Sequence, residues 1–429
     1  MMEIFLPFVG GLIFFMALGL PVFVALGATC LLALAMTSAS GGLPVELMSL
    51  KITQTLNSFP LLAIPLFILA ANLLNRGSAT TRIFDFANVM VGFVRGGLGH
   101  VNVVASMIFA GMSGTASADA AGLGALEIRA MREKGYDLKY STGITAASSV
   151  IGPIIPPSVA MLVYGWQADV SVGDLFLAGF VPGVLMAVLL MATTFIMSYK
   201  IDMPTRPLPT AREVFETGHR AVLPMLTPLI IVGGIWSGIF SPTEAGAVAC
   251  AYAIALGVFV YRDVKLKELF QVFVQSMEFS AVILLIIAIS GFYGWLLVRL
   301  QVPQALAADL VAMDLHTTIL LLILMVFFVL VGCFMSVIES VLILTPILVP
   351  AVAASGVDPL FFGVFMVITL SVGVITPPFG TVLYILVPIT GMRFEKVVLS
   401  VLPFLIPILA TILLVLFFPQ IVLILPRLF

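Results

Sequence analysis

The chain has few charged side chains: Asp, Glu, Lys and Arg make up 9% of its 429 residues, whereas 62% are hydrophobic. A soluble domain of this size could not cover its surface with so few polar groups. The net charge of −2 also excludes a surface built to neutralise nucleic-acid phosphates. The composition therefore predicts an integral membrane protein with no nucleic-acid partner.

Cysteine and histidine are equally scarce, with three of each. Cys30, Cys250 and Cys333 lie in apolar stretches without paired spacing, so neither a disulfide framework nor a metal-binding cluster of cysteines is expected, and we predict no resident cofactor. The apolar run 4–36 lacks a basic leader and is followed by further apolar runs, so it is not expected to be a cleaved signal.

Proline and glycine, in contrast, recur in a pattern. When the chain is shifted by 221 residues against itself without a gap, five prolines fall on prolines and three of the glycines fall on glycines. Such self-similarity predicts a duplication. The pairs are Pro7 and Pro228, Pro21 and Pro242, Pro156 and Pro377, Pro157 and Pro378, Pro182 and Pro403, Gly111 and Gly332, Gly135 and Gly356, and Gly152 and Gly373.

Apolar runs of about 20 residues predict an all-α membrane protein. Two of these runs, 100–131 and 317–354, carry polar residues in their middle, which is tolerated where the backbone is shielded by protein or lines a wet cavity, so we interpret them as re-entrant hairpins. The expected domains are a first repeat (1–200) with hairpin 100–131 and broken helix 141–166, a cytoplasmic linker (201–220), and a second repeat (221–429) with hairpin 317–354 and broken helix 360–388.

An odd number of crossings in each repeat makes the second copy inverted. On this topology, 16 of the 19 Lys and Arg residues fall on one side, which predicts that this side is cytoplasmic and that both termini face outward. Residues 4–36 fit either two short helices broken at 19–21 or one tilted helix, which would move the N-terminus inside. Residues 82–95 and 264–279 are expected to be interfacial helices.

The two doubled prolines define the predicted site. They lie in the stretches 151–158 (IGPIIPPS) and 372–381 (VGVITPPFGT). Because proline has no N–H and clashes with the preceding turn, two in succession must unwind a helix and free its carbonyl groups. In half-helix architectures such carbonyls bind sodium or polar substrate groups, and helix N-termini face anions. The alternative is a simple proline kink.

Hydroxyl groups at the hairpin tips complete the predicted site, because neutral oxygens are ligands suited to an alkali cation. One cation per repeat is expected, so at least two in all. The alternative for each hydroxyl is a bond to the preceding turn of its own helix. The predicted sodium ligands are Ser113, Thr115, Ser117, Gly152, Ser336, Ser340, Gly373 and Thr376, and the predicted substrate-binding residues are Ser113, Gly114, Thr115, Pro156, Pro157, Ser158, Ser336, Pro377, Pro378 and Thr381.

Two carboxylates lie just past the tips, at Asp119 and Glu339. An acidic residue at membrane depth is a candidate for proton or cation coupling, and the alternative is a buried structural partner. Glu244, in the sequence Ser241-Pro242-Thr243-Glu244, fits a helix N-terminal cap and is expected to be structural.

Several long stretches resemble the large membrane subunit of tripartite ATP-independent periplasmic (TRAP) transporters. They are 111–124 (GMSGTASADAAGLG), 152–158 (GPIIPPS), 241–246 (SPTEAG) and 373–380 (GVITPPFG), and the resemblance covers essentially the whole chain. It implies an elevator-type carrier of the bacterial inner membrane, in which a transport domain slides against a scaffold and sodium drives uptake. A periplasmic binding protein would deliver an organic acid, and a small membrane subunit would be a separate chain. The second tip, residues 335–339 (MSVIE), departs from the small or acidic cluster expected there.

Two alternatives remain at this stage. A stand-alone sodium-dicarboxylate carrier, or a channel, would need no binding protein. A rhomboid-like serine protease would use Ser113 in the GxSG pattern of residues 111–114, but it needs a histidine base, and His100, His219 and His316 are poorly placed. The substrate stays open between C4-dicarboxylates and sialic acids.

Overall fold

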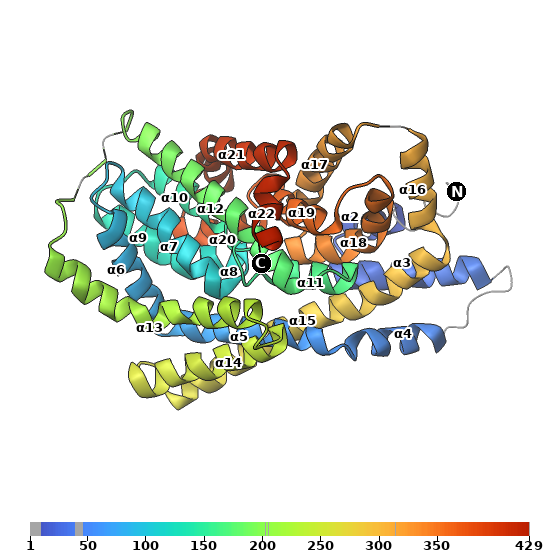
Figure 1. Cartoon of the computed structure of the whole chain (residues 1–429), viewed down its shortest axis with the longest axis horizontal. Coiled ribbons are helices and arrows are strands. Elements are labelled where there is room, and N and C mark those ends of the chain that lie inside the picture. The colour runs from blue at the N-terminus through green and yellow to red at the C-terminus, as the bar shows by residue number, and fades with distance from the viewer. Residues whose placement is uncertain (1–9, 39–45, 202, 205, 314, 429) are drawn as a thin grey trace.

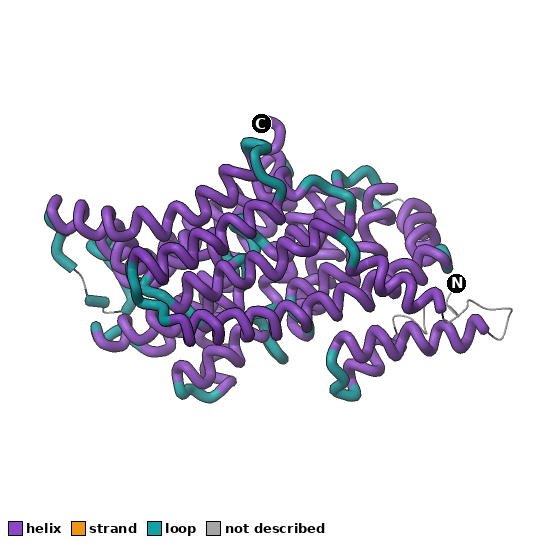
Figure 2. The backbone as a smooth tube through the Cα atoms, turned by 90° about the horizontal axis from the view of Figure 1, so that it is seen from below, coloured by secondary structure: helices purple, strands orange, loops and turns teal. Residues whose placement is uncertain are grey.

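A computed structural model describes residues 10–38, 46–201, 203–204, 206–313 and 315–428. Within these ranges the chain is built from helices joined by loops, as Figure 2 shows. The elements are α2 (Gly11–Ala17), α3 (Val22–Ser38), α4 (Glu46–Leu56), the 3-10 turn η2 (Phe59–Leu62), α5 (Ala63–Arg76), α6 (Ala79–Val91), α7 (Gly97–Ser113), α8 (Ala116–Ala121), α9 (Leu123–Glu133), α10 (Leu138–Ser149), α11 (Val159–Ala168), α12 (Val172–Met197), α13 (Ala211–Trp236), α14 (Pro242–Ile254), the π-helical η3 (Ala255–Val260), α15 (Leu266–Arg299), α16 (Val302–Ala312), α17 (Thr317–Phe334), α18 (Val337–Ala354), α19 (Pro359–Gly373), α20 (Thr381–Thr390), α21 (Phe394–Phe417) and α22 (Gln420–Leu428).

The all-α membrane fold predicted from composition is confirmed. By length and hydropathy, eight helical segments in the described ranges can cross a bilayer, and four shorter apolar helices accompany them. Leu, Ile and Phe side chains remain exposed along several of these helices, as lipid-facing surfaces require.

The helix order of the first half recurs in the second. A shift of 221 residues places Leu138, the first residue of α10, on Pro359, the first of α19, and it places Ser113, the last of α7, on Phe334, the last of α17. The sequence repeat is therefore also a repeat of helix boundaries. The inverted orientation of the second copy stays a prediction.

Both doubled prolines lie where a helix stops and a new one starts. The interruption between α10 and α11 contains Pro156 and Pro157, and the one between α19 and α20 contains Pro377 and Pro378. Both Pro–Pro bonds are cis. Proline cannot donate to the preceding turn, so each helix ends before the pair, and a new N-terminus forms after it. The break in the run 4–36 is also present, at residues 18–21 between α2 and α3, while residues 1–9 lie outside the described residues.

The two polar runs fold back on themselves. In the first, α7 leads to a tip at Gly114 and Thr115, and α8 and α9 return against α7. In the second, α17 leads to a tip at Met335 and Ser336, and α18 returns. Hydroxyl caps start these returning helices: Thr115 caps α8, and Ser336 caps α18.

Two expectations about the remaining segments were wrong, and one helix was missed. The separate interfacial helix expected at 264–279 is the first part of α15, which continues without a break to Arg299, because no proline or glycine interrupts it before Gly291. The linker expected at 201–220 is helical from Ala211, where the hydroxyl of Thr210 accepts from Glu213 N and caps α13. No helix was expected at α4, whose apolar periodicity is weak.

The equivalent of α15 in the first half is not continuous. A shift of 221 residues places α4 and α5 on α15, but the turn at η2, which contains Pro60, separates them. The turn is held from outside, because Trp166 Nε1 donates to Ser58 Oγ at 2.9 Å and Thr243 Oγ1 donates to the Phe59 carbonyl at 3.2 Å. The two halves thus contribute one interrupted and one uninterrupted long element.

These long elements lie together along one side of the molecule. In Figure 1, α13, α14, α5, α15 and α4 run along the lower edge, and the hairpins and broken helices lie above them. Within the upper body, α10 packs against α21, α17 against α19, and α12 against α22. α10 and α19 are buried along nearly their whole length, so they form the centre on which the site is built.

The close packing of Gly332 beside the second break predicts that a larger residue at this position would destabilise the protein. A Cβ at Gly332 would clash with the Leu370 carbonyl and lie 3.0 Å from Gly373 Cα, so Gly332→Ala should lower the free energy of unfolding by about 1–3 kcal/mol. At Gly233, in the interior of α13, a Cβ meets nothing within 4 Å, so Gly233→Ala should be neutral or stabilising. Thermal unfolding of the detergent-purified variants measures both; equal midpoints would contradict the packing.

Candidate functional site

The first hairpin tip rests directly on the first helix break. Gly114 has φ +63°, and a Cβ there would lie 2.5 Å from the Pro157 carbonyl oxygen. From the other side, a Cβ at Gly152 would lie 2.9 Å from the Thr115 carbonyl oxygen. Only glycine at these two positions lets the tip and the break approach so closely. The backbone groups of both segments therefore meet inside the protein.

The second tip meets the second break by a related contact. Gly332, just before the tip, packs backbone to backbone against Gly373, and Gly380 N donates to the Cys333 carbonyl at 3.2 Å. The break is closed across its own gap by Val382 N, which donates to the Val374 carbonyl at 3.1 Å. Each tip thus shares backbone contacts with the broken helix of its own repeat.

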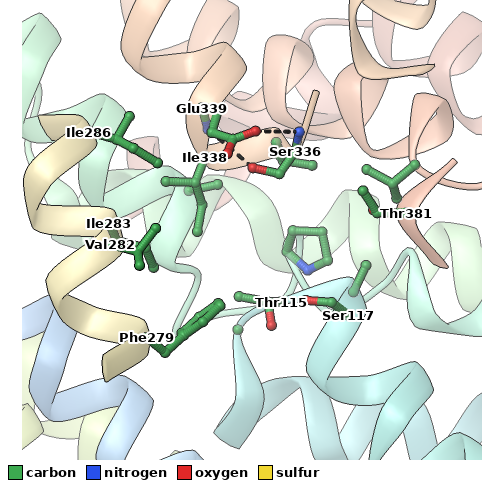
Figure 3. Close-up of a pocket in the computed structure, with 16 residues that line it drawn as sticks. Thr115, Ser117, Phe279, Val282, Ile283, Ile286, Ser336, Ile338, Glu339 and Thr381 are labelled. Carbon is green, nitrogen blue, oxygen red and sulfur yellow. Dashed lines mark hydrogen bonds between the residues drawn. The ribbon is translucent and has the colours of Figure 1, made fainter. Parts of the chain in front are cut away.

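A cavity of about 230 Å³ lies where the two tips face each other. Figure 3 shows Thr115 and Ser117 of the first tip on one side, and Ser336 and Glu339 of the second on another. The α15 helix forms a wall. The lining residues are Gly114, Thr115, Ala116, Ser117, Pro153, Ala160, Phe279, Val282, Ile283, Ile286, Ser336, Val337, Ile338, Glu339, Val374 and Thr381.

The first tip contributes three hydroxyls with different surroundings. Ser113 Oγ is buried and has no hydrogen-bond partner among the described residues. Thr115 Oγ1 accepts from Ala118 N at 3.3 Å and also faces the cavity, as does Ser117. Ser113 is therefore the one of the three whose buried oxygen is left open to a further ligand.

Several predicted residues support the cavity without lining it. Ser158 is buried, its hydroxyl donates to the Pro153 carbonyl at 2.5 Å across the break, and it accepts from Met161 N to cap α11. Gly152 and Gly373 are buried under the tips. The proline pairs differ: Pro156 and Pro157 are buried, whereas Pro377 and Pro378 are exposed. None of these residues is among those that line the cavity.

The hydroxyls of the second repeat mostly bond within their own helices. Ser340 Oγ donates to the Ser336 carbonyl at 2.9 Å, and Thr376 Oγ1 donates to the Val372 carbonyl at 2.7 Å. Such bonds use the hydroxyl proton and leave lone pairs on the oxygen. Ser336 and Thr381 line the cavity, whereas Ser340 and Thr376 stand behind it.

The two acidic candidates occupy different places. Glu339 lines the cavity and closes a capping box with Ser336, whose N–H donates to Glu339 Oε2 at 2.9 Å. Asp119 lies in α8 behind the tip, 1% exposed, with the Ser106 hydroxyl beside it but no partner within 3.5 Å among the described residues. The structure therefore separates them: one carboxylate faces the cavity and the other is enclosed.

The sequence interpretation missed Glu127. This residue of α9 is 1% exposed, neither of its oxygens has a hydrogen-bond partner among the described residues, and its carboxyl is close enough to Asp119 for the two to interact electrostatically. The helical periodicity of α9 could have indicated that Glu127 is buried, because Glu127 is a charged residue on an otherwise apolar face. The buried residues of this face are Leu123, Gly124, Glu127, Ile128 and Met131.

A buried polar layer joins the same hairpin to α10. Asn102 Nδ2 donates to Thr145 Oγ1 at 2.6 Å, Ser148 Oγ donates to Asn102 Oδ1 at 2.7 Å, and Ser106 Oγ donates to Ser148 Oγ at 3.1 Å. These bonds tie the hairpin arm α7 to the helix that carries the first break. Because buried side-chain bonds fix geometry, the first hairpin and its broken helix form one unit.

The apolar wall was also missed. Phe279, Val282, Ile283 and Ile286 line the cavity from α15, but residues 264–279 were expected to form an interfacial helix. Their 3–4 residue spacing places them on one face of a helix, yet nothing in that spacing distinguishes a cavity wall from lipid contact.

Comparison with known proteins decides the family. Residues 9–421 match the family described as the tripartite ATP-independent periplasmic transporter, DctM component. The chain belongs to this family. The predicted resemblance to the large TRAP membrane subunit is thereby confirmed, and the chain is a permease component rather than an enzyme.

Individual relatives agree. The chain is 42% identical to the sialic acid TRAP transporter permease protein SiaT of Haemophilus influenzae, covering 96% of this chain and 67% of that protein. It is 39% identical to the sialic acid TRAP transporter large permease protein SiaM of Vibrio cholerae, covering 96% of each. The fold is similar to that of the Alcanivorax borkumensis YdaH transporter, with a TM-score of 0.65 and 15% identity over 92% of this chain and 96% of that one.

Family membership also removes the protease alternative. His100 and Ser113 lie at opposite ends of α7. The Nε2 atom of His100 lies 3.1 Å from the Arg95 carbonyl oxygen. A nucleophilic serine requires a base within hydrogen-bond reach, and Ser113 Oγ has no hydrogen-bond partner among the described residues.

The enclosed Glu127 carboxyl supplies a prediction. A buried polar group without a partner costs about 1–3 kcal/mol, so Glu127→Met, which keeps the length of the side chain, should raise the thermal midpoint of the purified protein. Glu133→Met on the same helix is the matched control, because Glu133 is exposed and its pair with Arg129 is worth at most about 0.5 kcal/mol. A lower midpoint for Glu127→Met would mean that a bound ion or proton network stabilises the carboxyl.

Proposed function

We propose that this chain is the large membrane subunit of a sodium-coupled importer of an organic acid, of the sialic acid or C4-dicarboxylate type. It works with a separate small membrane subunit and with a periplasmic binding protein that delivers the substrate. The observation that carries the proposal is the cavity at which two hairpin tips and two broken helices meet. Relatives named as TRAP permeases support the class of substrate.

Sodium suits the oxygen atoms available at the first tip. Ser113 Oγ is buried and has no bonding partner among the described residues, and the carbonyl of Thr115 lies against Gly152 beside it. Hydroxyl and carbonyl oxygens are hard, neutral ligands for an alkali cation. In this proposal Ser113, Thr115, Ser117 and Gly152 hold one ion, and Ser336, Ser340, Gly373 and Thr376 hold the other. A bound sodium ion would supply the driving force and offset the negative charge of the substrate.

An elevator movement fits the surfaces around the cavity. The α15 wall presents only apolar side chains to it, namely Phe279, Val282, Ile283 and Ile286. A polar tip can slide past such a wall without breaking hydrogen bonds, so the barrier to sliding is one of packing. The moving unit would contain the hairpins and broken helices. In the first repeat, the bonds of Asn102, Ser106, Thr145 and Ser148 tie hairpin arm α7 to α10, which leads into the break.

The proposed location is the bacterial inner membrane, with the basic loops in the cytoplasm. Arg95 and Tyr199 are two residues on the side of the basic loops. The Arg95 guanidinium lies 4.3 Å from the centre of the Tyr199 ring and also donates to the Ser198 carbonyl. The positive-inside rule assigns such basic ends to the cytoplasm.

Uptake into liposomes tests the proposal as a whole. The chain is reconstituted with the small subunit, and labelled organic acid is supplied on the loaded binding protein with an inward sodium gradient. We expect accumulation that stops when sodium, the binding protein or the small subunit is omitted. Uptake that is unaffected when the binding protein is left out would instead support a stand-alone carrier.

The sodium ligands are tested one by one. Ser113→Ala and Thr376→Ala should each reduce sodium-driven uptake at least about tenfold, or raise the sodium concentration for half-maximal uptake, with normal membrane insertion. Thr193→Ala is the matched control for Thr376→Ala, because Thr193 Oγ1 makes the same bond to its own preceding turn, at 2.9 Å to the Leu189 carbonyl, on α12. If both Ser113→Ala and Thr376→Ala transport like the control, the ions are bound elsewhere.

A further inference from the structure

The lining of the cavity carries charge of one sign. Among the described residues that line it, Glu339 is the one charged residue, and none is Lys, Arg or His. The two sodium ions proposed at the tips would balance the charges of Glu339 and of one substrate carboxylate, so a substrate with two carboxylates would be expected to need a basic side chain as well. Here a second carboxylate would instead face Glu339, and like charges that approach each other inside a pocket repel strongly because little water screens them.

The Glu339 carboxylate is held in place by the helix that carries it. Its Oε2 accepts from Ser336 N at 2.9 Å, and Ser336 Oγ in turn accepts from Glu339 N. This capping box sits at the N-terminus of α18, where the helix dipole favours a negative charge. The other oxygen, Oε1, accepts no hydrogen bond from a described residue. A fixed acceptor with an open lone pair therefore faces the cavity.

The opposite side of the cavity offers donors. Figure 3 shows Thr381 on the side of the cavity away from the α15 wall, and Thr115 and Ser117 below. Thr381 is the first residue of α20, and its hydroxyl makes no hydrogen bond with a described residue, whereas the following N–H groups of Val382 and Leu383 donate to the Val374 and Gly380 carbonyls. Hydroxyl groups on that side of the cavity can each donate a hydrogen bond to one carboxylate. The cavity is thus polarised, with donors at one side and a carboxylate acceptor at another.

From this polarity we infer that the substrate carries one carboxylate and several hydroxyl or amide N–H groups, as a sugar acid does, and is not a dicarboxylate. Its carboxylate lies toward Thr381, and a hydroxyl or N–H donates to Glu339 Oε1. Glu339 is then a specificity residue that recognises neutral donors and rejects a second carboxylate. The inference rests on the proposed transport function and narrows its substrate class.

Competition binding tests the inference without the binding protein, whose own selectivity would otherwise intervene. The chain and its small subunit are placed in nanodiscs at constant sodium concentration. Labelled N-acetylneuraminate, a hydroxylated monocarboxylate, is bound and then displaced by unlabelled N-acetylneuraminate or by succinate. The unaltered protein should prefer N-acetylneuraminate over succinate by at least about tenfold.

Glu339→Gln removes the charge but keeps the capping box, in which glutamine also serves. This variant should lower the preference for N-acetylneuraminate at least about tenfold, through weaker binding of N-acetylneuraminate, tighter binding of succinate, or both. Glu339→Asp keeps the charge and should retain the preference for the monocarboxylate. Glu244→Gln is the matched control, since Ser241 and Glu244 form the same box at the start of α14, on an exposed surface, and it should change nothing.

The possible results distinguish a failure of the substrate inference from a failure of the proposed transport function. Succinate bound as tightly as N-acetylneuraminate by the unaltered protein, or an unchanged preference in Glu339→Gln, overturns the inference and leaves sodium-coupled transport standing. If neither acid binds in the presence of sodium, the proposed function is overturned along with it. An equal change in Glu244→Gln would show that the effect comes from helix capping and would also overturn the inference.

Discussion

Every break in a membrane helix must be closed by protein, because hydrocarbon offers no hydrogen bonds to backbone groups. This constraint organises the molecule. The segments around Pro156 and Pro377 can exist at depth only because a hairpin tip lies against each one, through Gly114 and Gly152 in the first repeat and through Gly332, Gly373 and Cys333 in the second. The small residues of the repeat are thus explained by contact between backbones.

The two repeats satisfy this constraint by different chemistry. In the first, the side chain of Ser158 spans the break and caps the next helix, and the proline pair is buried. In the second, backbone groups close the break, because the N–H groups of Gly380 and Val382 donate to the carbonyls of Cys333 and Val374. The proline pair of this break is exposed. A duplicated chain can therefore keep its architecture while the two copies diverge in accessibility, which leaves each half free to bind a different group.

Much of this arrangement could be predicted from the sequence, because proline and glycine act locally. The break sites, the tips at Ser113 and Ser336 and the capping role of Glu244 follow from backbone chemistry that neighbours cannot override. The burial of Glu127 and the wall formed by Phe279 and Ile283 could not, since those depend on which helix packs against which. The continuity of α15 was hidden by its charged first turns, which resemble an interfacial helix although the backbone runs straight on.

The difference between α15 and its counterpart has a mechanical meaning. The α15 helix is continuous over 34 residues, about 50 Å, and forms one rigid element. Its counterpart in the first half has a joint at Pro60, and the outside contacts of this joint come from Trp166 on a broken helix and from Thr243 on α14. A bend at Pro60 would therefore change the position of α11 relative to α14, whereas α15 has no joint at which to bend.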